Sequence, residues 1–291
     1  MEWTECLKTV IDYIEENLLN DISIEKVASK VYMSEFYLQK GFKIITGYSI
    51  GEYIRCRRLY MAALDVVAEE EKIIDLAYKY GYDTPESFTK AFTRFHGVAP
   101  KKLKRDTSKI KIFLPIRIIV SIKEGNDMDY VVEKMKAIKV IGFKKFFNFD
   151  TSYEKIPKFW QQFSKSYMEG KYSEEEQRAI EECCIGEFGI CICEDKNKSG
   201  FNYMIAGVYN GGGVPKGMEV YEVPALEWAK FKCIGPMPEA LQTVNTRIFN
   251  EWLPGNSKYE IAAEINIEWY SKGDGKSKEY KSEIWIPIKR K

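Results

Sequence analysis

A carboxylate and an indole stand two residues apart near the end of the chain, at Glu283 and Trp285. The residues around them alternate with a period of two, which is typical of a β-strand whose successive side chains point to opposite faces. Glu283, Trp285 and Pro287 then share one face, and the three isoleucines of 284–288 share the other, which we expect to be the core. A negative charge beside an aromatic ring suits a cationic, partly aromatic ligand.

The other residues that most often do chemistry are few or badly spaced. Seven cysteines are present, but Cys183-Cys184 and Cys191-x-Cys193 lack the ligand spacing and the nearby histidine of a zinc site. The one histidine, His96, lies at the expected end of a helix, where the helix dipole favours it. We therefore expect free thiols, no metal and no cofactor.

Size and composition indicate a globular protein. The chain has 291 residues, 45% of them hydrophobic and 30% charged, which is enough for two domains with separate cores. No apolar run approaches the roughly 20 residues that span a membrane, and the first residues do not resemble a signal peptide. The expectation is a cytoplasmic protein without membrane contact.

The first hundred residues repeat themselves. The segment 24–28 is echoed by 73–77, and 38–42 is echoed by 88–92, while Gly47 matches Gly97. Each copy has the length and spacing of a helix-turn-helix. Two such units in one chain can grip two successive major grooves, roughly 34 Å apart, without a partner subunit. The predicted partner is double-stranded DNA with an asymmetric site, and the predicted oligomeric state is a monomer or a weak dimer.

Local signals place the helices of this region. An amphipathic helix is expected to end near Asn20, Ser34 is expected to cap a helix over 35–46, and Pro85 suits the first turn of a helix over 85–95. A long helix over 50–67 joins the two units, with Ile54, Leu59 and Leu64 as buried candidates.

Charge distribution favours DNA binding although acids and bases nearly balance over residues 1–106. Because Leu38 and Phe42 should face the core, Gln39, Lys40 and Lys43 are left for the other side of their helix. Further basic clusters include Arg55 with its neighbours, and Lys90 with Arg94. A basic face can steer binding even when the net charge is close to zero.

Beyond residue 108 the pattern changes to strands and helices in alternation. Strands are expected over 110–122, 127–149, 188–193, 203–209, 218–233, 259–270 and 282–288, and helices over 156–168 and 238–252. A βαββ unit therefore occurs twice. The predicted fold is multidomain, with an all-α double helix-turn-helix domain over 1–108 and an α+β domain over 109–291.

The amino-terminal pattern resembles the DNA-binding domain of AraC/XylS-type transcriptional regulators. The resemblance implies that two recognition helices enter adjacent major grooves. By position, it places Phe36, Gln39 and Lys40 against bases in the first groove, and Glu86, Thr89 and Lys90 in the second. The residues that carry it are Ser34, Leu38, Phe42, Lys43, the segment 47–58, Ile74, Leu76, Ala77, Gly81, Tyr82, Phe88, Phe92, Gly97, Pro100 and Arg105.

The carboxyl-terminal order resembles the GyrI-like effector-binding domain, with the segments 264–268 and 283–288 as the matching strand endings. The resemblance implies a central cleft for small organic molecules, often hydrophobic cations, with a carboxylate near Glu283 deep in it and Trp160 on a wall. Tyr209, Glu264 and Trp269 are further candidates. The combination of both domains is similar to Rob-type regulators.

These patterns predict a sequence-specific transcriptional regulator, an activator that contacts RNA polymerase and is controlled by a small amphipathic or cationic effector. Two alternatives stay open. In one, the second domain hydrolyses a small molecule, with Glu283 or Glu264 as general base and Tyr209 or Tyr270 as proton donor. In the other, it only docks a protein partner. Taken without the resemblance, Glu283 could be a solvated strand residue and Trp160 an ordinary core tryptophan.

Overall fold

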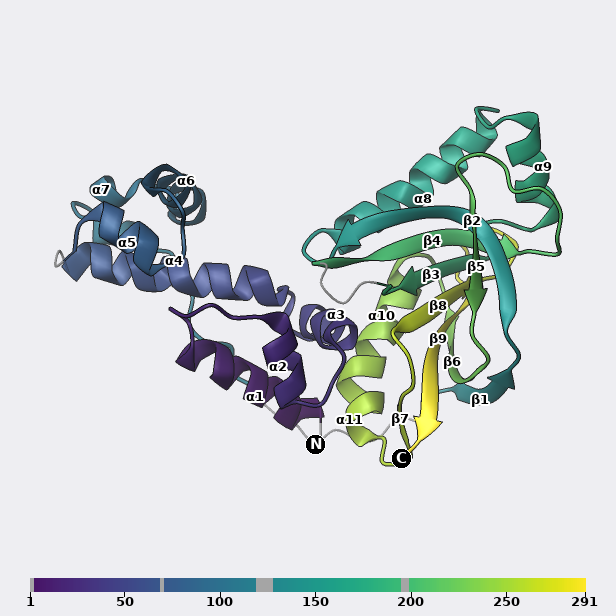
Figure 1. Cartoon of the computed structure of the whole chain (residues 1–291), viewed down its shortest axis with the longest axis horizontal. Helices are drawn as coiled ribbons and strands as arrows, with labels where there is room; N and C mark the ends of the chain where they lie inside the picture. The colour runs from purple at the N-terminus through teal and green to yellow at the C-terminus, as the bar shows by residue number, and fades with distance from the viewer. Residues whose placement is uncertain (1–2, 69–70, 119–127, 195–198) are drawn as a thin grey trace. The chain divides into compact units, whose positions relative to one another are not determined.

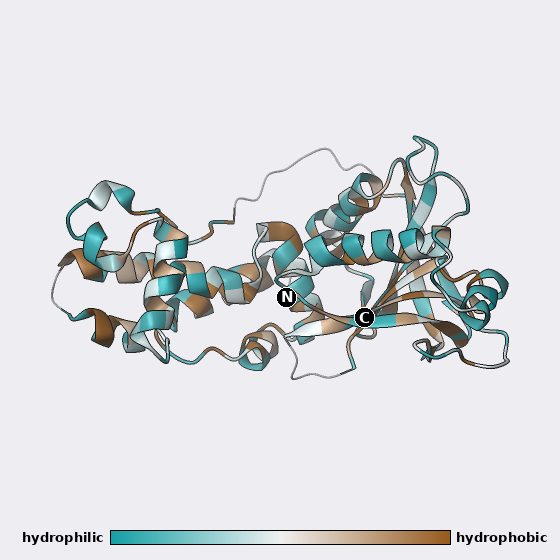
Figure 2. Cartoon of the chain, turned by 90° about the horizontal axis from the view of Figure 1, so that it is seen from above, coloured by the Kyte–Doolittle hydropathy of each residue, from teal (hydrophilic) through white to brown (hydrophobic). Residues whose placement is uncertain are grey.

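The computed structural model describes residues 3–68, 71–118, 128–194 and 199–291 (Figure 1). The chain forms two compact units, Met1–Ser121 and Ile122–Lys291. In both units the helices have hydrophilic and hydrophobic residues on different sides, as amphipathic helices do (Figure 2). Each unit therefore has a core of its own.

The first helix-turn-helix consists of α2 (Ile24–Lys30) and α3 (Glu35–Thr46), preceded by α1 (Trp3–Glu16). The expected cap is present, because the Ser34 side chain accepts a hydrogen bond from the backbone N–H of Tyr37. Gly47 ends α3 with φ at 77°, the left-handed conformation that glycine adopts without steric cost.

The second helix-turn-helix repeats this scheme. The helix α4 (Ile50–Ala68) joins the two helix-turn-helix motifs, and α5 (Ile73–Lys79) and α6 (Pro85–His96) form the second motif. Pro85 occupies the first turn of α6 as expected, and Thr84 is the capping residue. A short α7 (Pro100–Leu103) and the 3₁₀ turn η1 (Thr107–Lys109) follow.

The core of the second motif is formed by apolar side chains from α4 to α7. Phe88 and Phe92 of α6 are fully buried, with ring centroids 5.5 Å apart, and Leu59 of α4 packs in the same cluster. Leu64, in contrast, is 40% exposed, so its assignment to the core was wrong. It lies on the outer side of α4, whose polar and apolar residues are too mixed to reveal the buried stripe.

The segment after η1 is not a strand where the structure describes it. Residues 110–118 have an irregular backbone that is held against the first unit. The Arg57 guanidinium donates to the carbonyl oxygen of Phe113 over 2.5 Å, and the backbone N–H of Ile116 donates to the Tyr53 hydroxyl over 3.4 Å. The expected boundary at 108/109 therefore falls inside the first unit. The rest of the expected strand, from residue 119, lies outside the described residues.

The second unit is built on one antiparallel sheet. Its helices are α8 (Ser152–Met168), α9 (Glu174–Glu182) and α10 (Glu239–Arg247), and α10 continues into a π-helical turn η2 (Ile248–Trp252) and α11 (Leu253–Gly255). The strands in chain order are β1 (Tyr130–Met135), β2 (Ile138–Asn148), β3 (Phe188–Ile192), β4 (Gly200–Val208), β5 (Glu219–Val223), β6 (Leu226–Ile234), β7 (Tyr259–Ile261), β8 (Ile265–Tyr270) and β9 (Lys281–Arg290).

The strand order is β1-β6-β9-β8-β3-β4-β2-β5, with β7 beside β9. The two halves of the sheet are equivalent. Counted from opposite ends of the sheet, β1 corresponds to β5, β6 to β2, β9 to β4 and β8 to β3. The two expected βαββ units are thus β2-α8-β3-β4 and β6-α10-β8-β9, joined in the middle of the sheet by the β3–β8 pair. The helix α9 was not foreseen, although Ser173 and Glu176 form a capping box at its start.

The two faces of the sheet are covered differently. On one face Phe143 of β2 packs on Phe163 of α8, and Phe231 of β6 packs on Trp252 of η2. On the other face the strands bury a cluster of their own apolar side chains, and this cluster includes Trp228 and Trp285. Directly paired residues on neighbouring strands share a face, so the register shows which strand residues lie under the helices.

Candidate DNA-reading helix and effector site

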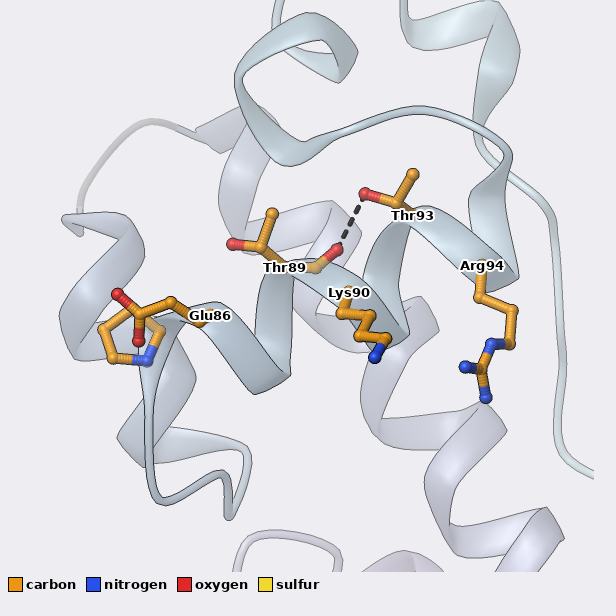
Figure 3. A pocket seen from close by; sticks show the side chains of 6 residues that line it. Glu86, Thr89, Lys90, Thr93 and Arg94 are labelled. Atoms are coloured by element: carbon orange, nitrogen blue, oxygen red, sulfur yellow. Dashed lines mark hydrogen bonds between the residues drawn. The ribbon is translucent and has the colours of Figure 1, made fainter.

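The recognition helix α6 presents a polar face. Glu86, Lys90 and Arg94 are exposed and lie four residues apart, so they project from the same side of the helix (Figure 3). Thr89 and Thr93 border the same shallow hollow, and the Thr93 hydroxyl donates to the carbonyl oxygen of Thr89 over 2.7 Å. A guanidinium, an ammonium and a carboxylate in this arrangement can contact base edges and phosphates.

The equivalent helix α3 differs. Phe36 is 0% exposed, and Gln39 and Lys40 are each 8% exposed. Seven consecutive residues of α3, from Phe36 to Phe42, have low exposed fractions. Gln39 and Lys40 lie on the same helix as the buried Leu38 and Phe42. Their use in base contacts, like that of Phe36, remains a prediction and requires that these side chains become accessible.

Of the remaining basic candidates, one forms an ion pair and another is exposed. Lys43 makes an ion pair of 2.7 Å with Glu52, whose carboxylate also accepts the backbone N–H of Ser49 at the start of α4. Arg55 is exposed on α4. Lys43 thus fixes the junction between α3 and α4, while Arg55 is available at the surface.

His96 has a structural role that the helix dipole did not predict. The backbone N–H of Lys111 donates to its Nδ1 over 3.1 Å, so Nε2 bears the proton and donates to the carbonyl oxygen of Leu59 at 3.0 Å. Burial lowers the pKa of His96, and the charge of Lys111 acts in the same direction. The neutral ring links α6 to α4 and to the segment after η1.

In the second unit, one carboxylate lies at the centre of an aromatic cluster. The hydroxyls of Tyr203 and Tyr270 donate to Oε2 of Glu268 over 2.6 Å and 2.8 Å. The Trp160 indole N–H in turn donates to the Tyr203 oxygen over 2.9 Å, and the rings of Trp160 and Tyr270 meet edge to face at 5.0 Å. We call Glu268, Tyr203, Tyr270 and Trp160 the Glu268 cluster.

The register explains how these residues meet. Glu268 on β8 is paired with Gly189 on β3 and with Ile284 on β9, so the side chains of Glu268 and Ile284 lie on the face covered by the helices, and a Cβ atom at Gly189 would point to the same face. A Cβ atom at Gly189 would stand 2.1 Å from the Tyr203 oxygen and 2.8 Å from Oε2 of Glu268. Because glycine has no Cβ atom, Gly189 leaves room for the hydrogen bond between Tyr203 and Glu268.

The surroundings keep both phenols protonated. Burial raises the pKa of Tyr203 and Tyr270 well above the usual value, and the neighbouring Glu268 carboxylate raises it further. Protonated phenols act as donors to the carboxylate. Among the described residues no lysine or arginine forms an ion pair with Glu268, so its negative charge is held by neutral donors alone.

The strand β9 has the predicted alternation, and its isoleucines at 284, 286 and 288 are buried as expected. Because Ile284 shares a face with Glu268, Glu283 and Trp285 point to the opposite face. There Trp285 is 6% exposed within the apolar cluster, its indole N–H donates to Glu283 over 2.6 Å, and Lys230 Nζ stands 4.0 Å from its ring centroid. The cation expected over this indole is thus supplied by the protein's own Lys230.

The other predicted ligand residues are scattered. Trp160 belongs to the Glu268 cluster. Trp269 packs against the apolar cluster on the opposite face and donates to Glu187 over 3.0 Å. Tyr209 follows β4 and donates to the carbonyl oxygen of Gly212, and Glu264 precedes β8 in a half-buried position. The hydrolase alternative paired Tyr270 with Glu283 or Glu264, whereas the structure pairs it with Glu268.

Sequence reasoning missed Glu268 and Tyr203. A signal was available for Glu268, because it stands two residues from Tyr270 in a strand and so shares its face. Nothing local distinguishes Tyr203 among the 19 tyrosines of the chain. In the described part of the chain no group of three or more histidine, cysteine or acidic residues is arranged to hold a metal ion, and no helix is long and apolar enough to cross a membrane.

Comparisons with known proteins agree with this division into two units. Residues 131–288 match the family of integron-associated effector binding proteins, and residues 27–106 match a helix-turn-helix domain family. The multiple antibiotic resistance protein MarA of Escherichia coli is 35% identical over 98 residues, which are 34% of this chain and 77% of MarA. The chain belongs to the MarA-related AraC-type regulators and to the integron-associated effector-binding family.

Further relatives have the same amino-terminal domain. The regulatory protein SoxS of Salmonella typhimurium is 36% identical over 94 residues, covering 32% of this regulator and 88% of SoxS. The transcriptional regulator Rob of the same organism is 32% identical over 120 residues, covering 40% of this regulator and 42% of Rob. The regulator is therefore a DNA-binding transcriptional regulator with an effector-binding domain.

Solved structures are similar to part of the chain at lower identity. A putative transcription regulation protein from Staphylococcus aureus is 25% identical with a TM-score of 0.42, over 56% of this chain and 99% of that protein. An integron cassette protein from Vibrio cholerae is 14% identical with a TM-score of 0.38, over 55% of this chain and 95% of that protein.

Proposed function

We propose that this regulator activates transcription in response to a cationic, partly aromatic organic molecule that binds at the Glu268 cluster. The observation that supports the proposal is the chemistry of the cluster: a half-buried carboxylate is surrounded by aromatic rings and has no cationic partner among the described residues. A ligand cation would neutralise this charge and contact the negative faces of the rings.

Control requires that the effector bind two states of the regulator with different affinities. The DNA-bound state holds an asymmetric site of two half-sites, about one helical turn apart, and contacts RNA polymerase. A monomer suffices for this, because one chain contains both readers. Glu86, Thr89, Lys90 and Arg94 of α6 read the second half-site, while Phe36, Gln39 and Lys40 read the first after they become accessible.

Binding of DNA is tested with duplexes selected from a random pool by the full-length protein at near-physiological salt, where non-specific attraction is weak. An asymmetric consensus with two blocks is expected. Lys90→Ala should cost about 1–3 kcal/mol and relax one position of the second block. Lys8→Ala removes the same charge from the exposed side of α1 and should leave the consensus unchanged. Equal effects of both substitutions would mean that Lys90 contributes charge only.

Binding of the effector is tested by calorimetry with an aromatic monocation. Glu268→Gln should weaken binding about tenfold or more, which is about 1.4 kcal/mol. Glu283→Gln is the matched control, because it removes the same charge from the opposite face of the sheet and should change affinity less than twofold. If Glu283→Gln weakened binding and Glu268→Gln did not, the ligand would bind on the other face of the sheet.

A further inference from the structure

A buried amide near the Glu268 cluster lacks a hydrogen-bond partner. Asn245 of α10 is 8% exposed, and its Oδ1 is buried with no partner among the described residues. Buried polar atoms are paired in the great majority of cases, because an unpaired one loses its hydrogen bonds to water without replacement. An acceptor of this kind indicates a ligand atom that donates to it.

The position of Asn245 supports this assignment. Asn245 lies on the buried side of α10, which packs on β6 and β9 of the helix-covered face. Glu268 of β8 is paired with Ile284 of β9 and lies on the same face. Burial and the charge of Glu268 raise the pKa of Tyr153 at the start of α8, while Asn245 acts on this pKa in the opposite direction, which agrees with a position of Asn245 near that carboxylate. Asn245 and Glu268 therefore both line the helix-covered face.

We infer that the effector is a protonated amine or amidine on an aromatic frame, which donates an N–H to Oδ1 of Asn245 while its charge neutralises Glu268. This inference rests on the proposed function, since it names the class of ligand for the same site. A quaternary ammonium or a phosphonium has the charge but no donor, and it would leave Oδ1 unpaired. Asn245 thus selects between two classes of cation that Glu268 alone does not distinguish.

The test uses two ligands that share their rings and their charge and differ in the methylation of the nitrogen, which removes the hydrogen-bond donors. Biphenyl-4-ylmethylamine is protonated at neutral pH, and its trimethylammonium analogue has the same rings and charge without an N–H. Calorimetry with the full-length protein should show that the wild type binds the amine about tenfold more tightly.

Two substitutions in α10 test whether Asn245 is the source of the preference for the amine. Asn245→Leu keeps the number and branching of the side-chain heavy atoms and removes the amide, so the preference should fall below about twofold while affinity for the quaternary analogue stays within about twofold. Gln242→Leu alters an exposed amide on the same helix and should behave as the wild type. Thermal unfolding serves as the folding readout, and Asn245→Leu should not lower the midpoint, because it removes an unpaired polar atom.

The outcomes separate this inference from the proposed function. Equal binding of the two ligands by the wild type, or a preference that persists in Asn245→Leu, would overturn the inference, and the amide would then be satisfied by water alone. If affinity still depended on Glu268 in that case, the proposed function would stand. If neither cation bound the wild type, both would fail.

Discussion

The space above Gly189 gives the most direct test of the Glu268 cluster. A Cβ atom there would lie 2.1 Å from the Tyr203 oxygen, 2.8 Å from Oε2 of Glu268 and 2.9 Å from Tyr203 Cζ. All three distances are below any real Cβ contact, and the neighbours are a buried ring and a hydrogen-bonded carboxylate. Gly189→Ala must therefore displace the Tyr203–Glu268 hydrogen bond or move the strand.

The expected cost follows from these contacts. Overpacking of a filled site costs about 1–3 kcal/mol, and a lost hydrogen bond to a charged group costs about 1.5–3 kcal/mol. An effect of about 3 kcal/mol would lower the unfolding midpoint of a domain of this size by about 6–12 °C. The reduced entropy of the unfolded chain opposes this by less than about 1 kcal/mol.

Thermal unfolding followed by circular dichroism measures the effect. Gly213→Ala is the matched control, because its Cβ would meet no atom within 4 Å and its φ is not in the left-handed region. A double-mutant cycle with Tyr203→Phe removes the nearest atom, so alanine at position 189 should cost about 1 kcal/mol less in that background. Equal midpoints for the two glycine substitutions would refute the reasoning, and so would additivity in the cycle.

Two further predictions concern the first unit. Because burial holds the His96 pKa below its unfolded value, the unfolded chain binds more protons, and the free energy of unfolding should decrease as pH falls below about 6.5. Urea unfolding between pH 7.5 and 5.5 measures this decrease. His96→Gln removes the one histidine and should abolish the pH dependence. If the free energy of unfolding changed with pH as steeply in His96→Gln as in the wild type, His96 would not be its source. Glu15→Gln should cost about 3 kcal/mol, because it leaves the buried Arg57 guanidinium without its 2.7 Å carboxylate partner. Glu16→Gln, an exposed neighbour, should stay within about 0.5 kcal/mol in the same urea measurement, and equal costs would show that the Arg57 pair contributes nothing.

The sequence by itself determined the elements whose signals are local. The repeated motif, the Ser34 cap, Pro85 in the first turn and the terminating Gly47 and Gly97 each depend on residues within one or two turns of the chain. The two βαββ units were also visible, because strand alternation and helix periodicity are short-range patterns. These signals sufficed to predict two domains and their fold classes.

Only the tertiary structure decided which surfaces could contain a site. Period-two alternation shows that Glu283 and Ile284 point to opposite faces, but not which face the helices cover, since that depends on how α8 and α10 pack on the sheet. Within the Glu268 cluster, alternation along β8 places Glu268 and Tyr270 on one face, but only strand pairing and the packing of α8 bring Tyr203 and Trp160 to them.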